Sequence, residues 1–278
     1  MAETVEELIA AVGELPAMPA VAHRVSELVR DPKVSAADLE RVIETDPALA
    51  GRILRIANSA FYGGYRSVST IQAAVMRMGF DAVRGLVVAA SVKSVYRRFG
   101  LTEQQLWEHA VGTAIGSRIV AKETGVNPDE AFVAGLLHDV GKTVLANNHA
   151  ERYAEVFQAV YSEGVPSLAA EVGVFGFGHT EIGGSVVRRW RLPESIEECV
   201  RHHHQPLGAD PACRALVAVV AVANMMAHAN GIGLREAEEV PDLYEGGVAS
   251  MIRLSPDRVP ILREQAMEAY KAEREVFA

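Results

Sequence analysis

The sequence contains little cysteine and few aromatic residues. Only two of its 278 residues are cysteine, Cys199 and Cys213, and they form no CxxC pair. A disulfide framework or a zinc ribbon is therefore not expected. Phe, Trp and Tyr make up 6% of the chain, whereas Ala, Val and Leu are abundant. This composition is typical of closely packed helices rather than of a β-sandwich.

Basic residues and long apolar runs are also scarce. Lys and Arg number 27 against 36 Asp and Glu, for a formal net charge of -9. This balance argues against nucleic-acid binding, which depends on neutralising phosphates. The segment from Met1 to Glu7 is acidic, unlike a signal peptide, and the apolar run at 216–229 contains Asn224 and is shorter than the ~20 residues of a membrane span. We expect a cytoplasmic protein that does not enter the membrane.

Helix start and stop signals follow one another along the chain. Ser35 and Asp46 can cap helix N-termini, and Gly79 can end a helix at 71–78. No stretch alternates apolar and polar residues between hairpin turns, so no strand is predicted. The predicted fold class is all-α. The N-terminal helices are expected from Thr4, from Pro19 to Asp31, from Ser35, from Asp46 to Ala57, at 71–78, and from Asp81 towards Tyr96.

A capping pattern of Thr102 with Gln105 predicts the start of a helix at 103–123 and marks a domain boundary. We expect an N-terminal helical lobe at 1–100 and a larger helical lobe at 101–278. No linker rich in Pro, Gly or Ser separates them, so the two lobes are expected to pack together. Further helices are predicted at 128–139, 150–163, 167–175, 180–191, 193–203, 212–230, 243–251 and 256–276.

Six of the nine histidines and one aspartate form a pattern with chemical meaning: His109, His138-Asp139, His179 and His202-His203-His204. Neutral imidazoles with a carboxylate suit Fe, Mn, Zn or Co, and such an ion lowers the pKa of a bound water and polarises a phosphoryl oxygen. Adjacent helical side chains point about 100° apart, so His138 and Asp139 can share a cation only at a helix end, where Gly141 supplies freedom. Lys142 either adds a positive charge for a phosphate or satisfies carbonyls at the helix C-terminus.

The run Leu137-His138-Asp139-Val140-Gly141-Lys142 resembles the signature of the HD superfamily of metal-dependent phosphohydrolases. The resemblance implies a first histidine on the preceding helix and, as in the two-metal HD-GYP branch, further histidines on later helices. The last family ligand is an aspartate on a long apolar helix, and the matching residue here is an asparagine. The implied metal ligands are His109, His138, Asp139, His179, His203, His204 and Asn224. They would hold one or two divalent ions of Fe, Mn or Zn.

Three departures from the family pattern weaken the case for turnover. Asn224 is a neutral and weaker ligand than the aspartate it replaces. Gln105 stands where some two-metal members have a glutamate, and Gln205-Pro206-Leu207 follows the paired histidines in place of the Gly-Tyr-Pro signature of cyclic dinucleotide cleavage. The pattern therefore favours binding over catalysis.

Four N-terminal segments resemble the HDOD domain, the HD-related output domain of bacterial signalling proteins; they lie at 15–19, 44–49, 54–62 and 71–75. The resemblance covers 15–229 and implies an N-terminal bundle packed on an HD-like bundle. It also implies a regulatory signal-transduction module that acts by binding a signalling protein or a nucleotide. The alternative is a metal-dependent phosphohydrolase acting on a nucleotide or phosphodiester, in which Asp139 and Lys142 are catalytic.

The remaining candidates have plainer readings. Glu181 either supports His179 or faces solvent. Asn58 either caps its helix or, with the loop at 58–69, contacts a partner, and His202 is expected to face solvent. Three further histidines are assigned to structural or surface roles: His23, His149 and His228.

Overall fold

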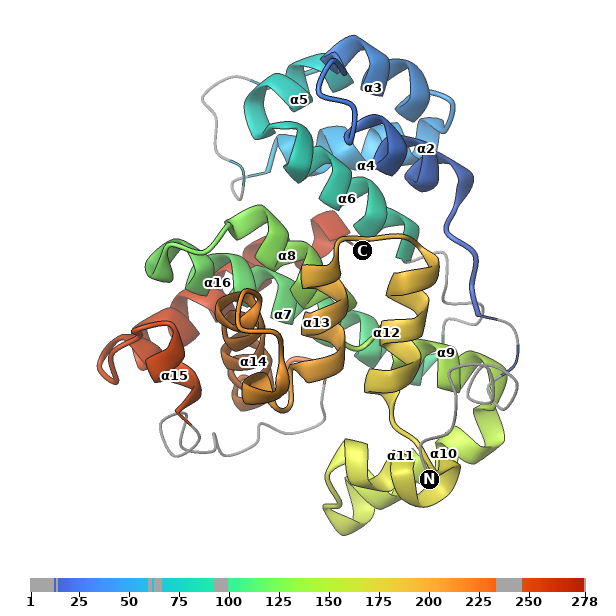
Figure 1. Ribbon diagram of the computed structural model, residues 1–278, viewed down its shortest axis with the longest axis vertical. Helices are drawn as coiled ribbons and strands as arrows, with labels where there is room; N and C mark the ends of the chain where they lie inside the picture. Colours follow the sequence, from blue (N-terminus) through green and yellow to red (C-terminus); the bar gives the residue numbers. More distant parts are fainter. Residues whose placement is uncertain are drawn as a thin grey trace.

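The computed structural model describes residues 13, 15–59, 62, 67–92, 100–233 and 247–277. Within these ranges helices predominate and no strand occurs, which confirms the all-α prediction. The helices form two groups: α2 to α6 lie together at one end, and α7 to α16 form the larger body (Figure 1). An N-terminal helical bundle therefore packs on a second, HD-like one, as the resemblance implied.

The N-terminal bundle comprises α2 (Ala20–Leu28), α3 (Ala36–Ile43), α4 (Pro47–Ala57), α5 (Ile71–Met78) and α6 (Phe80–Val92). Two predicted caps are present: Ser35 and Asp38 form a capping box, and the Asp46 carboxylate accepts a hydrogen bond from Leu49 N at 3.0 Å. The helix expected from Thr4 lies outside the described residues.

Asn58 is the C-cap residue of α4, and its side chain holds the two ends of the following loop together. Its amide nitrogen donates to the Val68 carbonyl at 2.8 Å, and its amide oxygen accepts from Val68 N at 2.7 Å. The capping interpretation of Asn58 is therefore the better one. The loop residues 60, 61 and 63–66 lie outside the described part of the chain.

The larger body comprises α7 (Leu101–Thr124), α8 (Pro128–Leu137), α9 (Val140–Asn148), α10 (Ala150–Glu163), α11 (Ser167–Phe175), α12 (His179–Arg189), α13 (Glu194–His202), η2 (Pro206–Gly208), α14 (Arg214–Ala229), α15 (Val248–Met251) and α16 (Arg258–Phe277). Helix α7 is buried along most of its length, because α8, α14 and α16 all pack on it. None of the described helices has the length and apolar character that a membrane crossing requires.

The start of α7 differs from the prediction. Its N-cap is Gly100, whose backbone N–H donates to the Glu103 carboxylate at 3.0 Å, so the expected pairing of Thr102 with Gln105 is wrong. The helix begins two residues earlier than expected because a glutamate at the third helical position satisfies a free N–H at the helix end.

The helix predicted at 128–139 is two residues shorter, and a second helix follows it directly. Helix α8 ends at Leu137, Asp139 leaves the helical conformation with φ -105° and ψ 15°, and α9 begins at Val140. The prediction missed α9. In a regular helix the side chains of His138 and Asp139 would point about 100° apart. The break removes this constraint, so that both side chains can face the same site.

Gly141 has a different role from the one expected. A Cβ atom at this position would lie 2.0 Å from the backbone oxygen of His179. The glycine is therefore required because α9 and α12 approach each other backbone to backbone, not because the chain needs flexibility there.

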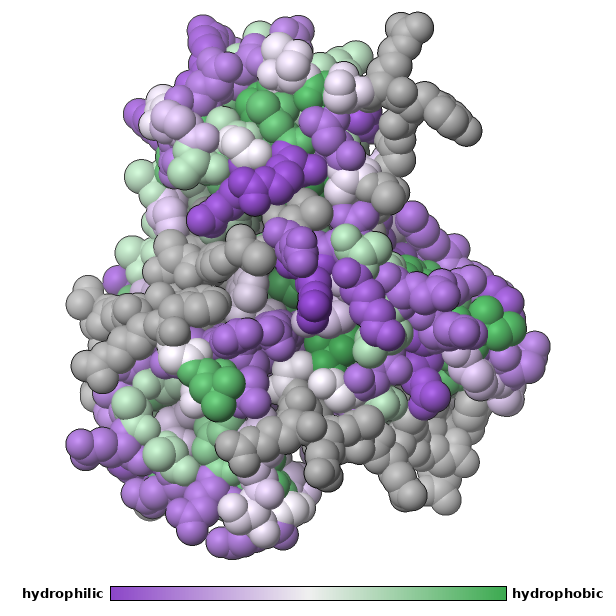
Figure 2. Space-filling model, turned by 180° about the vertical axis from the view of Figure 1, so that it is seen from behind, coloured by the Kyte–Doolittle hydropathy of each residue, from purple (hydrophilic) through white to green (hydrophobic). Residues whose placement is uncertain are grey.

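Contacts between side chains join the two bundles. The Arg118 guanidinium of α7 lies 4.2 Å from the centroid of the Tyr62 ring and forms an ion pair with Asp129 at 2.6 Å. Burial raises the pKa of Tyr62 to about 12. Trp190, at the end of α12, donates to the Pro16 carbonyl at 2.9 Å. On the face shown in Figure 2, hydrophilic residues dominate and apolar residues occur in separate small areas.

Candidate metal centre

The break between α8 and α9 directs His138 and Asp139 into the interior of the larger body. Helix α7 adds His109, α12 adds His179 and α13 leads into His203, and all five side chains are buried. His204 follows His203; the residue as a whole is exposed, but its ring lies against His179, where it is partly buried. The structure therefore brings the predicted ligand residues together from segments that are far apart in the sequence.

One group of side chains surrounds the Oδ2 atom of Asp139. His138 Nε2 lies 3.3 Å from this oxygen and His109 Nε2 lies 3.7 Å from it. The potential ligand atoms of these three residues lie within 4.8 Å of one another. Asn224 joins the group through His109, because its Oδ1 atom lies 2.8 Å from His109 Nε2.

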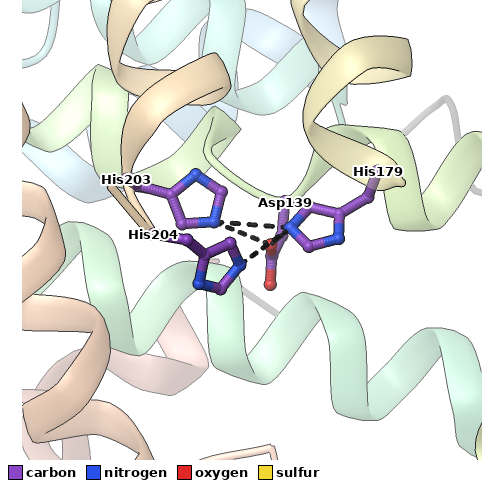
Figure 3. A group of neighbouring side chains, drawn as sticks. All are labelled: Asp139, His179, His203 and His204. Carbon is purple, nitrogen blue, oxygen red and sulfur yellow. Dashed lines mark hydrogen bonds and ion pairs between the residues drawn. The ribbon is translucent and has the colours of Figure 1, made fainter. Parts of the chain in front are cut away.

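A second group surrounds the other oxygen of Asp139, as Figure 3 shows. His179 Nε2 lies 3.2 Å from Oδ1 and His203 Nε2 lies 3.5 Å from it. His204 Nε2 lies 3.1 Å from His179 Nε2. One carboxylate thus faces both groups, with three imidazoles on one side and two on the other.

The hydrogen bonds of three histidines show which ring nitrogen is free. His138 Nδ1 lies 2.7 Å from the Gly135 carbonyl, His203 Nδ1 lies 3.0 Å from the Val200 carbonyl, and His179 Nδ1 lies 2.6 Å from a carboxylate. In the neutral ring a proton on Nδ1 leaves the Nε2 lone pair unused. All three Nε2 atoms converge on Asp139.

This arrangement fits a divalent transition metal. His138 Nε2 and Asp139 Oδ1 are buried and have no hydrogen-bond partner among the described residues. His138 Nε2 lies 3.3 Å from Asp139 Oδ2, and His179 Nε2 lies 3.2 Å from Asp139 Oδ1; lone pairs this close in the interior require a cation or a proton between them. The donor set of imidazoles and one carboxylate suits Fe, Mn or Zn rather than Ca or Mg.

Glu171, on α11, is the functional residue that the sequence-based interpretation missed. It is fully buried, and its Oε2 accepts from His179 Nδ1 at 2.6 Å and from His179 N at 2.7 Å. Such a carboxylate orients a ligand histidine and raises its basicity. Glu181, the acid considered for this role, instead accepts from Gly178 N at 2.8 Å and caps α12. The available signal was a lone carboxylate in the apolar segment 167–175.

Burial sets the protonation of most of the histidines. It lowers the pKa of His109 well below 6.5, lowers that of His203 to about 4, and also lowers that of His204. These rings are therefore neutral at pH 7 and present lone pairs. For His179, burial acts in the same direction, but the Glu171 carboxylate outweighs it and raises the pKa.

Lys142 forms a buried ion pair with the central carboxylate, with Nζ 2.7 Å from Asp139 Oδ2. Burial would lower the pKa of Lys142, but the carboxylates of Asp139 and Glu171 raise it above 10.5. Burial would likewise raise the pKa of Asp139, but His138, Lys142 and His179 around it hold it well below 3.8. Lys142 lies in the first turn of α9, so the alternative that it satisfies helix C-terminal carbonyls is wrong.

His228 belongs to the same region, contrary to its assignment to structure or surface. Its ring centroid lies 4.5 Å from that of His109, and burial lowers its pKa to about 4. Its spacing of four residues from Asn224 on α14 could have revealed this, because residues four apart share a helix face. Of the other histidines, His202 is partly exposed beside Glu198 and His23 is exposed.

The sequence profile of the HDOD domain matches residues 15–206. The chain belongs to the HDOD domain family. Two solved structures resemble this HDOD protein over nearly its whole length. An HDOD domain protein of unknown function from Geobacter sulfurreducens is 26% identical, with a TM-score of 0.82 and coverage of 99% of this chain and 97% of that one. A Shewanella amazonensis protein provisionally assigned as a phosphohydrolase is 25% identical, with a TM-score of 0.76 and coverage of 97% and 96%.

Curated relatives of this HDOD protein are longer than it is. An uncharacterised protein of Treponema pallidum is 27% identical over 77% of this chain, which corresponds to 42% of its own length. Several bacterial proteins named ribonuclease Y are 25–30% identical over 41–79% of this chain and 15–34% of their own length. The chain thus spans less than half the length of these relatives.

Proposed function

We propose that this HDOD protein is a bacterial signal-transduction module whose HD-type centre binds a divalent metal and serves for ligand binding rather than for hydrolysis. The observation that carries the proposal is Asn224, which stands where the HD pattern has an aspartate and hydrogen-bonds to His109 at 2.8 Å. This residue removes a negative charge from a buried centre.

Charge balance supports a single ion. Asp139 and Glu171 are the buried carboxylates of the centre, and Lys142 already compensates one negative charge. Two divalent ions would leave a large uncompensated positive charge in the interior, which is costly. A single divalent ion leaves far less uncompensated positive charge.

The second group of ligands is the better place for that ion. It has three imidazoles and Asp139, and Glu171 supports His179 from behind. In the other group, His109 Nδ1 faces the Ile232 carbonyl at 3.3 Å, so the proton of the neutral ring is on Nδ1 and Nε2 carries a lone pair. Asn224 then turns its amide nitrogen, rather than its oxygen, towards Nε2 and donates to this lone pair. The lone pair is therefore not available to a metal. An asparagine can donate to this nitrogen, whereas an aspartate cannot.

The resemblance to output domains of bacterial signalling proteins supports a regulatory role. In this role the protein receives its input from a signalling partner or from a small molecule, and a ligand acts by preferring one conformation. We place the protein in the cytoplasm, with neither membrane nor nucleic acid as its partner.

A metal-dependent phosphohydrolase acting on a nucleotide or phosphodiester is the second candidate. The six retained ligand positions, Asp139 and five histidines, favour it, as does the similarity to ribonuclease Y proteins over part of the chain. A bound divalent ion would supply a water of lowered pKa and polarise the phosphoryl oxygen. In that case Asp139 would hold the metal and Lys142 would orient the phosphate.

Elemental analysis and an activity screen separate the two candidates. We expect near-stoichiometric Fe, Mn or Zn in the purified protein, lost in His203→Ala, and no release of phosphate or nucleotide from nucleotides, cyclic dinucleotides or RNA with Mn or Fe supplied. Steady turnover that disappears in His203→Ala would establish the hydrolase instead. Absence of metal after reconstitution would overturn both.

A further inference from the structure

The centre opens on one side into a cavity of about 660 Å³. His109, Asp139, Lys142 and His204 line its inner end. The volume lies within the range of about 300–1,000 Å³ that is typical of small-molecule sites. Asn224 also lines the cavity, so the cavity adjoins the metal centre and has room for a ligand beside it.

One wall of the cavity is an apolar face of α10. Five of its side chains recur at helical spacing and line the cavity: Tyr153, Val156, Phe157, Val160 and Tyr161. The rings of Phe157 and Tyr161 are stacked, with centroids 5.0 Å apart and an interplanar angle of 23°. Both side chains are only partly buried, so no other described part of the chain covers them fully. Val165 and Pro166 continue this wall.

Few of the side chains that line the cavity are charged. Lys142 is the one Lys or Arg among the described lining residues, and it is paired with Asp139. A ligand with several phosphates would bring more negative charge than one ammonium and one divalent ion can balance. The lining suits a molecule that is mostly apolar and carries a single anionic group at the inner end.

We propose that the cavity binds a small molecule with an apolar, ring-containing body and one oxyanion head, either a carboxylate or a phosphate monoester. The head lies at the centre beside Lys142, and the body lies against Phe157, Val160 and Tyr161. The inference rests on the proposed function, because the metal supplies the charge that balances the head. Rings stack on aromatic side chains in offset or tilted arrangements, which a flat apolar body can adopt here.

The test measures binding of 1-naphthyl phosphate to the full-length, Mn-loaded protein by isothermal titration calorimetry. We expect 1-naphthyl phosphate to bind at least tenfold more tightly than inorganic phosphate, which has the head alone, and than ATP, which has a ring and several charges. A parallel titration with 2-naphthoate distinguishes a phosphate from a carboxylate head. Release of 1-naphthol is followed in the same samples, and none is expected.

Two substitutions in the wall test the placement of the body. Phe157→Ala is expected to weaken binding of 1-naphthyl phosphate at least fivefold, while Phe175→Ala, which removes a similarly half-buried ring outside the cavity, leaves it unchanged. Val160→Asp places a like charge in the wall and is expected to abolish binding. Circular dichroism and metal content are measured for each variant, so that a folding or metal defect is recognised.

The outcomes separate this inference from the proposed function. A metal-loaded protein that binds 1-naphthyl phosphate no better than inorganic phosphate, or binds ATP more tightly, overturns the ligand class but leaves the metal centre in place. Equal effects of Phe157→Ala and Phe175→Ala overturn the placement. A protein that takes up no metal refutes the proposed function, and the inference falls with it.

Discussion

Asn224 and Asp139 together determine how much positive charge the centre can hold. Asp139 faces both groups of imidazoles, whereas Asn224 hydrogen-bonds to His109, which belongs to one of them. An amide and a carboxylate have almost the same shape, so exchanging them changes charge and hydrogen-bonding character with little effect on packing. The residue at 224 can therefore be tested without disturbing the fold.

Asn224→Asp is expected to raise the metal content from one towards two ions per chain. The added carboxylate cannot donate to His109 Nε2, which frees that lone pair, and its negative charge offsets a second ion. Plasma mass spectrometry of Mn-reconstituted protein measures the ratio. The control is Asn230→Asp at the end of the same helix, outside both groups. An unchanged ratio in Asn224→Asp would refute the single-ion argument.

Glu171→Gln is expected to weaken metal binding by about 10- to 100-fold, the usual cost of losing a carboxylate that supports a ligand histidine. The amide is isosteric but holds the His179 ring less firmly and makes it less basic. Competition with a fluorescent chelator gives the affinity. Glu181→Gln, which alters only the cap of α12, should leave the affinity unchanged; a comparable loss there would show that the effect is structural.

At the scale of secondary structure, the close contact of α9 with α12 positions Asp139 against His179. Gly141 allows this contact, since the His179 backbone oxygen occupies the place where a Cβ atom would be. The ligands thus depend on a backbone packing that involves none of their own side chains.

Gly141→Ala is expected to destabilise the protein by about 3 kcal/mol, at the upper end of overpacking effects, because backbone atoms cannot move aside as a side chain can. The shift of the urea midpoint at constant slope measures this. Gly173→Ala on α11 is the matched control: no atom lies within 4 Å of its added Cβ, so it should be neutral or stabilise by up to ~1 kcal/mol. Equal midpoints for the two variants would contradict the packing argument.

The same elements show how far the sequence alone leads. Most helices were predictable because caps and apolar spacing encode them, and the ligand positions around Asp139 were predictable from the resemblance of the run 137–142 to the HD superfamily signature. Helix α9 was not predictable, because a glycine at 141 indicates a helix end in the sequence, and only the structure shows that it allows α9 to pack closely on α12. Glu171 was not, because its partner lies on another helix eight residues away. His228 was not, because its contact with His109 depends on how α14 packs on α7.

At the scale of the whole molecule, the centre joins the helices of the larger body. An ion that binds only the folded state stabilises it by mass action, by about 2.7 kcal/mol at a concentration 100 times its dissociation constant. For a protein of this size each kcal/mol shifts the melting temperature by roughly 2–4 °C.

Mn or Zn at that concentration is therefore expected to raise the melting temperature by about 5–10 °C over the EDTA-treated protein. Differential scanning calorimetry measures the shift, and EDTA should reverse it. His203→Ala, which lacks a buried ligand of the second group, should melt at the same temperature with and without metal. An equal rise in this variant would place the stabilising ion elsewhere.

The ligand atoms of the second group come from the break before α9, from α12 and from the end of α13. No single hairpin of helices contains the set, so a chain emerging from the ribosome has no centre until the last of these helices docks. Capture of an ion must then follow chain folding instead of nucleating it. The ion would then cross-link helices that have already docked. The rate of metal uptake during refolding would therefore report the rate of the last docking step.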